Sequence, residues 1–335
     1  MISLAIFALA LLFITTMLLR DVLKFFRSGF GENIRIDFSD DFSGRKYYIH
    51  SEQLFQQSLE YDKNGAVMSR YKNDLFYNPA YTAWHGLVCL NKYYSTDDTS
   101  YLNTLEKQIA WLKQNAKHDR MLGNVWYYNF DWKEGDITLK KPWISAMAQG
   151  LIISLLVKTY MLTKEQKLLQ LAEGATKVYQ LSTENGGIKY VGNSSTFYEE
   201  YPSEKALKIL DGFIFSLLGV YDLFKATGNE KYLHIFNDGV TTIERNINFW
   251  DYRQRWSRYG SHKFLCTPLY NKLNSKLLFV LYTISKRKKL LYYSRAWQPD
   301  QLSIQSKVEI LLAFFVTRNI KRLRYFWSYY FGGRR

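Results

Sequence analysis

Three apolar segments, Gly86-Leu-Val-Cys-Leu90, Gly150-Leu-Ile-Ile-Ser-Leu-Leu156 and Gly212-Phe-Ile-Phe-Ser-Leu-Leu218, decide the fold. Each of them predicts the opening of an apolar helix, which is followed by a polar turn and by a second, amphipathic helix. The second helices start at a regular spacing of 66 and then 65 residues, at Tyr101, Lys167 and Tyr232. A regular period of one buried and one half-exposed helix is typical of an array of αα repeats.

The array continues toward the C-terminus, because Leu277–Ile284 predicts a fourth apolar helix. Helices this apolar cannot face water, so the helical hairpins must curl onto one another. An incomplete α/α toroid is the simplest closure, and we predict a mainly α fold of this kind. No linker rich in Pro, Gly or Ser interrupts the stretch, so residues 77–335 are predicted to form one domain.

A short β-rich region precedes the helices. Between Ile34 and Tyr71 short alternating runs are punctuated by turn signals at Ser43-Gly44 and Asn64-Gly65. This pattern predicts two or three strands arranged as hairpins. We assign residues 21–76 to a linker and this β-rich region.

The first twenty residues differ from the rest in composition. Ile2–Leu19 is apolar apart from three hydroxyl residues and spans roughly 27 Å as a helix, enough for a thin bilayer. A signal peptide normally has a basic start and a small-residue cleavage site, and both are lacking here, which favours an uncleaved membrane anchor over residues 1–20. The basic residues follow the segment, at Arg20, Lys24 and Arg27, and by the positive-inside rule they favour a cytoplasmic body.

Composition excludes several classes of function. The 335 residues carry a net charge of +15, which favours an anionic partner or a membrane surface. Two cysteines give no disulfide scaffold and no C-x-x-C pair, and five scattered histidines show no metal-binding spacing. Neither the dinucleotide nor the P-loop glycine motif is present. The basic, aromatic C-terminal region, with Lys286–Lys289 and Arg318–Arg324, fits either a solvated helix face or contact with a polyanion or anionic lipid.

Three segments carry more polar and aromatic detail than packing requires: Pro142–Gly150, Phe197-Tyr-Glu-Glu-Tyr-Pro202 and Phe249–Asn274. The second places two adjacent carboxylates between tyrosines in a loop. The third interleaves Arg253, Arg255 and Arg258 with aromatic residues that could stack on sugar rings. A nucleic-acid interface is conceivable for basic and aromatic sequence, but a helical toroid with a membrane anchor favours sugar acids, and we expect no nucleic-acid partner.

Taken in order, Trp143–Gly150, Phe197–Pro202 and Gly212–Asp222 resemble the C-terminal domain of the D-glucuronyl C5-epimerases, the enzymes of heparan sulfate and heparin biosynthesis. The resemblance extends weakly from Tyr77-Asn-Pro79 to Tyr270, over roughly 200 residues. It implies an α/α toroid preceded by a β-rich region. It also implies conversion of glucuronic acid to iduronic acid residues within a polymer.

The resemblance also implies the site residues. The tyrosine of the family's Glu-Glu-Tyr-Pro motif is Tyr201, with Glu200 before it, and the other catalytic tyrosines fall on Tyr259 and Tyr270. The family's arginine after the second tyrosine appears as His262, and Asn271 and Asn274 replace two family histidines. The Leu-Asn-Gly of many members is Leu210-Asp211-Gly212 here. The predicted substrate contacts are Trp143, Gln149, Asp211, Phe215, Arg253, Arg258, His262, Asn271 and Asn274.

Epimerisation at C5 removes a proton α to a carboxylate and returns one to the opposite face of the ring. It needs a clamp on the carboxylate, and a base and an acid on opposite faces. We expect two of the three tyrosines to exchange the protons, with Glu200 orienting or accepting, and nearby cations (Arg253, Arg255, Arg258 and His262) to hold the carboxylate and lower the tyrosine pKa values.

The expected partners are an anionic polysaccharide and, through the N-terminal helix, a membrane; a homodimer is left open. The chemistry needs no cofactor. The resemblance leaves room for a structural calcium ion, for which no ligands can be assigned, and Asp37, Asp40 and Asp41 lack the EF-hand spacing. As a single-pass protein the chain would face the Golgi lumen in a eukaryote or lie at the inner membrane of a bacterium. Two alternatives stay open: a uronate lyase, and a non-catalytic protein that binds acidic glycans.

Overall fold

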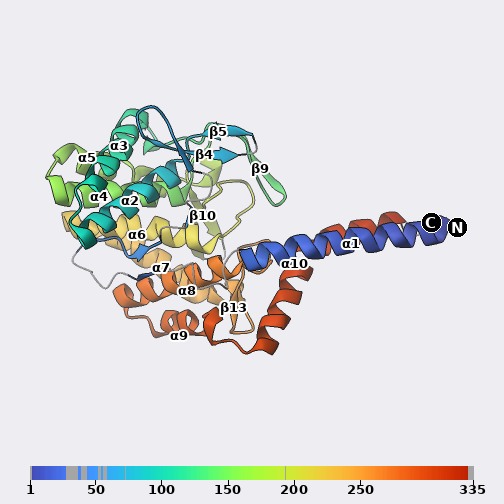
Figure 1. Ribbon diagram of the computed structural model, residues 1–335. Helices are drawn as coiled ribbons and strands as arrows, with labels where there is room; N and C mark the ends of the chain where they lie inside the picture. The colour runs from blue at the N-terminus through green and yellow to red at the C-terminus, as the bar shows by residue number, and fades with distance from the viewer. Residues whose placement is uncertain are drawn as a thin grey trace.

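The computed structural model describes residues 2–27, 37–38, 44–51, 54–55, 59–71, 73–192 and 194–330. Within this part of the chain the body is built from consecutive helix pairs, followed by a long C-terminal helix (Figure 1). The pairs are α2 (Pro79–Thr96) with α3 (Ser100–Asn115), α4 (Ala146–Thr163) with α5 (Gln166–Gly174), α6 (Leu210–Thr227) with α7 (Glu230–Trp250), and α8 (Pro268–Ser285) with α9 (Lys288–Ala296). The prediction of a mainly α protein is confirmed.

The first helix of each pair forms an inner layer, in which α2 contacts α4, α4 contacts α6 and α6 contacts α8. The second helix of each pair packs on the outside of its own partner, as Figure 1 shows for α3, α5 and α7. The inner helices are buried on nearly all sides; in α4 every residue from Ala146 to Thr159 is buried. This arrangement is the inner and outer layering of an incomplete α/α toroid.

The inner helices begin earlier than the glycines suggest, because the polar residues before them act as caps. The side chains of Asn78, Ser145 and Thr267 accept hydrogen bonds from backbone N–H groups of the first turns of α2, α4 and α8. Gly86 and Gly150 consequently lie inside α2 and α4 rather than at their starts. The expectation that these glycines open the helices is therefore wrong by one to two turns.

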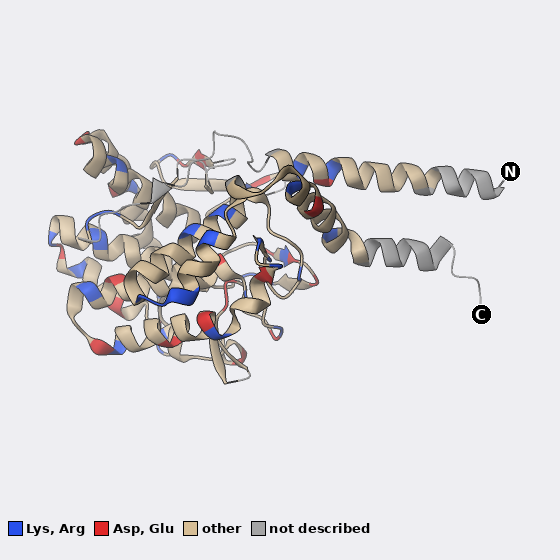
Figure 2. Cartoon of the chain, turned by 90° about the horizontal axis from the view of Figure 1, so that it is seen from below, with Lys and Arg blue, Asp and Glu red and all other residues tan. Residues whose placement is uncertain are grey.

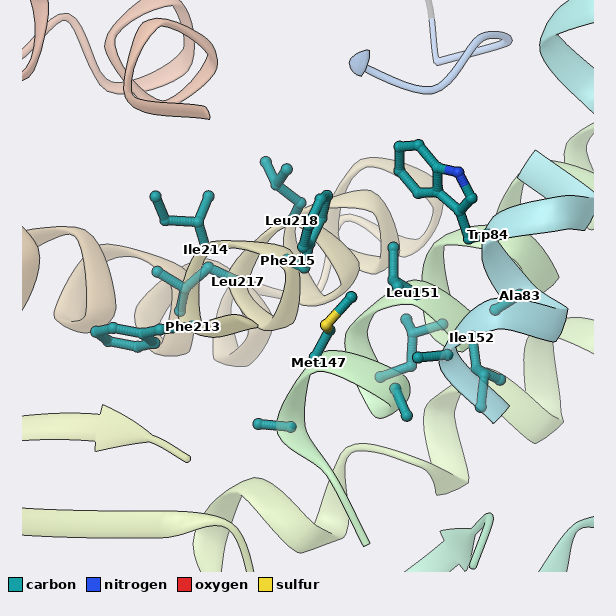
Figure 3. Packing of buried hydrophobic residues seen from close by; sticks show 14 of the residues in the cluster. Ala83, Trp84, Met147, Leu151, Ile152, Phe213, Ile214, Phe215, Leu217 and Leu218 are labelled. Atoms are coloured by element: carbon teal, nitrogen blue, oxygen red, sulfur yellow. The ribbon is translucent and has the colours of Figure 1, made fainter. Parts of the chain in front are cut away.

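The glycines in α4 and α6 have a packing role instead. A Cβ atom on Gly150 would collide with the backbone of Phe215 and Ser216 on α6, and one on Gly219 would collide with the backbone of Gly150. The two helix backbones therefore cross without side chains between them. Figure 3 shows how Met147, Leu151 and residues of α6 close the core beside this crossing.

Short antiparallel hairpins fill the connections from an outer helix to the next inner helix. The pairs are β6 (Lys117–Asp119) with β7 (Gly123–Val125), β8 (Trp132–Glu134) with β9 (Ile137–Leu139), β10 (Lys189–Gly192) with β11 (Ser195–Tyr198), and β12 (Asp251–Tyr252) with β13 (Trp256–Ser257). The sequence predicted none of them. Because each connection ends where an inner helix begins, the hairpins lie near the N-terminal ends of the inner helices.

The N-terminal region contains strands, as predicted. β1 (Asp37–Phe38) pairs with β2 (Ile49–His50), and β3 (Leu59–Tyr61), β4 (Val67–Tyr71) and β5 (Asp74–Phe76) form a three-stranded antiparallel sheet. The turn from β3 to β4 contains the predicted Asn64-Gly65 pair, and Gly65 has a φ of 81°, a conformation that favours glycine.

Two helices leave the body side by side, α1 (Ile2–Arg27) and α10 (Ile304–Tyr330) (Figure 1). A small second core of Phe25, Trp256, Leu265, Ile310 and Phe314 joins them to the body. The charged residues of α1 lie at its end close to the body (Figure 2). α1 therefore continues past the predicted anchor boundary at residue 20 and docks on the body through Phe25.

Within the described residues, α4 is the helix that meets the length and apolarity needed to cross a membrane, and 78% of that segment is buried in the body. We interpret α4 as a core helix, since its neighbours α2 and α6 cover it. The anchor predicted over residues 1–20 stays a prediction.

Candidate active site

The first turns of the four inner helices converge on one pocket, which holds about 510 Å³ of empty space, part of it open to solvent. α2 contributes Tyr81, α4 contributes Met147, α6 contributes Asp211 and α8 contributes Tyr270. The residues that line it are Phe55, Asn78, Ala80, Tyr81, Tyr128, Phe130, Trp132, Trp143, Ser145, Met147, Glu200, Tyr201, Asp211, Tyr259 and Tyr270.

The three tyrosines expected to be catalytic reach this pocket from three different elements. Tyr201 follows β11, Tyr259 follows β13, and Tyr270 lies in the first turn of α8. The rings of Tyr259 and Tyr270 meet edge to face, with centroids 6.1 Å apart at 87°. Residues 201, 259 and 270, which the sequence alone could only align with family motifs, thus surround one space.

Further aromatic rings line the pocket beside Tyr201. The ring of Trp132 on β8 is nearly parallel to that of Tyr201, with centroids 6.3 Å apart, and Trp143 lies 6.0 Å from Tyr201. Trp143 in turn stacks on Tyr128 at 4.0 Å. Its indole N–H donates to the Phe130 carbonyl over 2.8 Å, which fixes the ring. Such flat apolar surfaces suit the faces of sugar rings.

Glu200 and Asp211 are the acidic members of the lining. Both are buried, with 8% and 3% of their surface exposed. The Tyr201 hydroxyl interacts with Glu200, whereas Glu200 Oε2 has no hydrogen-bond partner among the described residues. Asp211 lies at the start of α6, where its own backbone N–H and that of Gly212 act to lower its pKa. The pocket therefore contains Asp211, at a helix N-terminus, and Glu200, which has one oxygen without a hydrogen-bond partner.

Burial controls the ionisation of these groups. It raises the pKa of Tyr201, Tyr259 and Tyr270 well above 10, and the neighbouring Glu200 carboxyl raises all three further. The pKa of Glu200 is raised well above 4.5, by burial first and by Asp211 second. Burial raises the pKa of Asp211 to about 6. The expectation that nearby cations lower the tyrosine pKa values is wrong, since these tyrosines stay protonated near neutral pH.

Glu199 holds the loop that carries Glu200 and Tyr201. Its carboxylate accepts hydrogen bonds from the backbone N–H groups of Leu207, at 2.9 Å, and of Lys208, at 3.0 Å. Burial raises the pKa of Glu199 to about 7, although these two hydrogen bonds act in the opposite direction. The first acid of the Glu-Glu-Tyr-Pro segment is therefore structural, and the second faces the pocket.

The predicted arginine clamp does not reach the pocket lining. Arg253 is exposed and pairs with Glu309 on α10, and Arg255 lies 3.2 Å from the same carboxylate. Arg258 is half-buried, with its guanidinium 5.9 Å from the centroid of the Tyr252 ring. Among the described residues that line the pocket there is no lysine, arginine or histidine. The electrostatics of the site are thus those of a neutral-to-acidic pocket.

His262 lies beside the pocket rather than in its lining. Its ring stacks on Phe264 with centroids 5.1 Å apart, and Nε2 lies 3.6 Å from Glu134 Oε1. Phe264 stacks in turn on Tyr259 at 5.4 Å. His262 is therefore one ring removed from a pocket tyrosine.

Four further residues predicted to contact substrate lie in the core. Both ends of the Asn271 amide are used, since Oδ1 accepts from the Ser257 N–H at 2.7 Å and Nδ2 donates to the Trp297 carbonyl at 2.6 Å. Asn274 Nδ2 donates to Ser257 Oγ and Cys266 Sγ. Gln149 donates to the carbonyls of Asn124 and Ala175, and Phe215 is fully buried. The structure places these side chains in packing and backbone support, outside the pocket lining.

The sequence interpretation missed several lining residues, among them Phe55, Tyr81, Tyr128, Phe130 and Trp132. They belong to the N-terminal region, to α2 and to the connection before α4. Only Tyr77-Asn78-Pro79 signalled this part of the site, as an N-cap followed by a proline at a helix start.

No three His, Cys, Asp or Glu side chains come together as a metal site within the described residues. Asp40 and Asp41, considered for calcium, lie outside them.

Parts of the chain are similar in sequence to known proteins. Residues 118–299 match the family described as D-glucuronyl C5-epimerase C-terminus. The chain is 37% identical over 90 residues to the D-glucuronyl C5-epimerase of Caenorhabditis elegans, covering 27% of this chain and 15% of that protein. It is 28% identical over 178 residues to an uncharacterized protein of Methanocaldococcus jannaschii, covering 52% of this chain and 57% of that protein. The matches therefore span less than two thirds of either relative.

The fold is shared more widely. The structure of cellobiose 2-epimerase from Bacillus thermoamylovorans superposes with a TM-score of 0.50 and 12% identity, over 73% of this chain and 67% of that one. The fold and the pocket at the inner helix N-termini thus define a protein of the α/α-toroid class. Within this class the chain belongs to the D-glucuronyl C5-epimerase C-terminal domain family, because that family's match covers more than half of its residues.

Proposed function

We propose that this protein is an epimerase that inverts C5 of D-glucuronic acid residues to L-iduronic acid within a heparosan- or heparan-like polysaccharide. One observation carries the proposal: Tyr201, Tyr259, Tyr270 and Glu200 surround a single pocket in a chain of the epimerase family. Each residue type matches a role that C5 inversion requires.

The reaction removes the C5 proton on one face of the sugar and delivers a proton on the other. The pocket tyrosines are held protonated, because burial and the neighbouring carboxyl raise their pKa values well above 10. They are therefore proton donors. The base is a carboxylate, and Glu200 suits the role because burial raises its pKa, which makes the ionised form a stronger base.

The protons balance over one turnover. Ionised Glu200 takes the C5 proton, and a tyrosine hydroxyl gives its proton to the opposite face of C5, leaving a tyrosinate. The carboxylic acid so formed then returns a proton to the tyrosinate, and Tyr201, which interacts directly with Glu200, offers a route for it. No redox step is involved, and the C4–O bond stays intact.

The remaining features fit a polymer substrate at a membrane. The net charge of +15 attracts a polyanion, and the stacked rings of Trp143 and Tyr128 offer a sugar-binding wall. α1 is apolar from Ile2 to Leu19, and we propose that it anchors the chain as a single-pass membrane protein.

The test uses the full chain in detergent, with N-acetylheparosan in deuterated water. NMR follows deuterium at C5 and the appearance of iduronate, and ultraviolet absorbance follows any unsaturated uronate. Deuterium at C5 with iduronate and no unsaturated product is the expected result. Unsaturated product would mean a lyase, which breaks the C4–O bond after the same proton abstraction. Absence of exchange with a panel of uronate polymers would contradict the proposal.

A further inference from the structure

The candidate pocket has an unusual charge balance for a site that would bind a uronic acid. Its described lining contains the carboxyls of Glu200 and Asp211 and no cationic side chain. A bound uronate would bring a third carboxylate into the same small space. Like charges at such separation cannot all remain ionised, so one proton at least must be shared among them.

The helix N-termini around the pocket offset part of the negative charge of these carboxylates. α2, α4, α6 and α8 all begin at its wall, and each helix start carries roughly half a positive charge. On α6 the N–H groups of Asp211 and Gly212 already interact with the Asp211 carboxyl. Helix starts alone would therefore leave the substrate carboxylate without a strong hydrogen-bond donor from α6.

The second observation is the position of Glu200. Its side chain is more than nine-tenths buried, it lines the pocket, and Oε2 has no hydrogen-bond partner among the described residues. It lies directly against Gly212, where any Cβ atom would collide with Oε2. The glycine therefore lets the carboxyl of Glu200 reach the start of α6, next to Asp211.

We propose that Glu200 and Asp211 hold one proton between them, and that the uronate carboxylate, by approaching Asp211, draws this proton from Glu200 onto Asp211. Protonated Asp211 then hydrogen-bonds the uronate carboxylate, while ionised Glu200 takes the C5 proton. The pair would thus replace the cationic clamp that the arginines do not provide. This inference rests on the proposed function and adds a recognition residue to it.

Among the described residues, eight other titratable groups interact with one or both of the carboxyls: Tyr81 on α2, Tyr128, Glu134 on β8, Glu199, Tyr201, Tyr259, Cys266 and Tyr270 on α8. The tyrosines and the Cys266 thiol are neutral near neutral pH, since burial raises the pKa of Cys266 to about 12 and that of Tyr81 to about 12. Glu199, whose pKa burial raises to about 7, is bound to the backbone of Leu207 and Lys208 instead of lining the pocket. Glu134 raises the pKa of both carboxyls, which favours retention of the proton by the pair.

The proposal predicts that the affinity for the uronate depends on pH. Above the pKa of the pair both carboxyls are ionised, and the substrate can bind only by taking up a proton. The apparent affinity for the uronate should then fall about tenfold for each pH unit. The tyrosines do not contribute to this loss, because their pKa values lie well above 10.

The experiment measures KM and kcat of the full chain for heparosan oligosaccharides between about pH 6 and pH 9, by C5 deuterium exchange. Wild-type KM should rise about tenfold per pH unit over the upper part of this range. Asp211→Asn should show a KM that is nearly independent of pH, whatever its kcat. Asp238→Asn, which removes an exposed carboxylate on α7, is the matched control and should follow the wild type. Parallel KM profiles for the wild type and Asp211→Asn would overturn the proposal.

A second readout does not depend on turnover. Calorimetric binding of the oligosaccharide at about pH 8, in buffers of different ionisation enthalpy, should show uptake of about one proton by the wild type and by Glu200→Gln, but none by Asp211→Asn. Binding with proton uptake but no C5 exchange would contradict the epimerase function and support proton sharing between Glu200 and Asp211. C5 exchange with a pH-independent KM would contradict proton sharing between Glu200 and Asp211 and support the epimerase function. Absence of binding at every pH would contradict both.

Discussion

Asn319 on α10 donates a hydrogen bond from Nδ2 to the carboxylate of Asp21 on α1, across 298 positions of sequence. Both side chains are buried, and Arg20 adds a 2.8 Å ion pair to Asp21. One helical turn further along α1, Phe25 packs on Phe314 of α10 and on Trp256 beside the pocket loop. The helix proposed as membrane anchor is thus fixed to the catalytic body by polar and aromatic contacts rather than by a loose linker.

Replacing Asn319 tests this attachment. Asn319→Ala removes a partner from a buried carboxylate, and the free energy of unfolding should fall by about 1–3 kcal/mol. Denaturant unfolding of the full chain in detergent measures it. Gln305→Ala, at an exposed position of the same helix, is the control and should change stability by less than about 0.5 kcal/mol. Equal losses in the two variants would show that the Asp21 contact contributes nothing specific.

Tyr201 should be needed for turnover and not for folding. Tyr201→Phe removes the hydroxyl that interacts with Glu200, so C5 exchange should fall at least about 100-fold, the scale of a lost general acid. The thermal unfolding midpoint should stay near that of the wild type. Tyr232→Phe is the control, because Tyr232 is buried away from the pocket and its hydroxyl has no hydrogen-bond partner among the described residues. Wild-type exchange by Tyr201→Phe would remove this residue from the mechanism.

The sequence predicted the helical pairs because their signal is local: an apolar run, a polar turn and an amphipathic helix follow one another within each repeat. It predicted Glu200, Tyr201, Tyr259 and Tyr270 through motif order, and the structure brings them to one pocket. That pocket depends on helix starts, and the apolar pattern located those of α2 and α4 too late by one to two turns. The caps that set the true starts, such as Asn78, are single polar residues with little pattern around them.

The prediction that nearby arginines hold the substrate carboxylate was wrong for a different reason. Arg253 and Arg258 are close to Tyr259 in sequence, but β12 and β13 form a tight hairpin that turns their side chains onto Tyr252. Two-residue strands carry too weak an alternation to be seen in a sequence. Likewise Asn271 and Asn274 follow Tyr270 on α8 but do not line the pocket. They lie three residues apart on one face of the helix and hydrogen-bond Ser257, with further bonds to the Trp297 carbonyl and to Cys266. Nearness in sequence was therefore a poor guide to nearness in the site.

The backbone crossing of α4 and α6 gives a stability prediction. In Gly150→Ala the new methyl group would meet the carbonyl of Phe215 and the backbone of Ser216, which cannot move without separating the helices. A loss of about 1–3 kcal/mol in the free energy of unfolding is expected. Gly86→Ala is the matched control, since its Cβ would meet only the flexible end of the Leu155 side chain. Comparable losses in the two variants would contradict a backbone-to-backbone contact at Gly150.

Glu199 should make folding stability depend on pH. Its pKa is about 7 in the folded protein, against 4.5 for the free group, so between these values the folded state holds a proton that the unfolded state has lost. Stability from this residue is therefore greatest below about pH 4.5 and falls, by about 2–3 kcal/mol, as the pH rises to 7. Glu199→Gln should lose this part of the slope in urea unfolding at different pH values. Parallel slopes would show that Glu199 ionises normally.

The buried ion pair of Lys158 on α4 and Asp222 on α6 holds the N-terminal region to the inner layer. Lys158 Nζ lies 3.1 Å from Asp222 Oδ1 and 3.2 Å from the Gly44 carbonyl, and the Tyr48 hydroxyl donates to Asp222 at 2.6 Å. Lys158→Met fills the space of the lysine but leaves the carboxylate of Asp222 buried without its counter-charge. The free energy of unfolding should fall by about 3–5 kcal/mol.

A second substitution separates charge from packing. In Lys158→Met with Asp222→Asn no charge remains buried, while the new amide can still accept the hydrogen bond from Tyr48. Most of the lost stability should then return, because the cost of the single variant lies in the unpaired carboxylate rather than in the missing attraction. Denaturant unfolding of the three proteins gives the coupling energy. If the double variant is as unstable as Lys158→Met, the lysine acts through its packing and its bond to Gly44, and the ion pair is incidental.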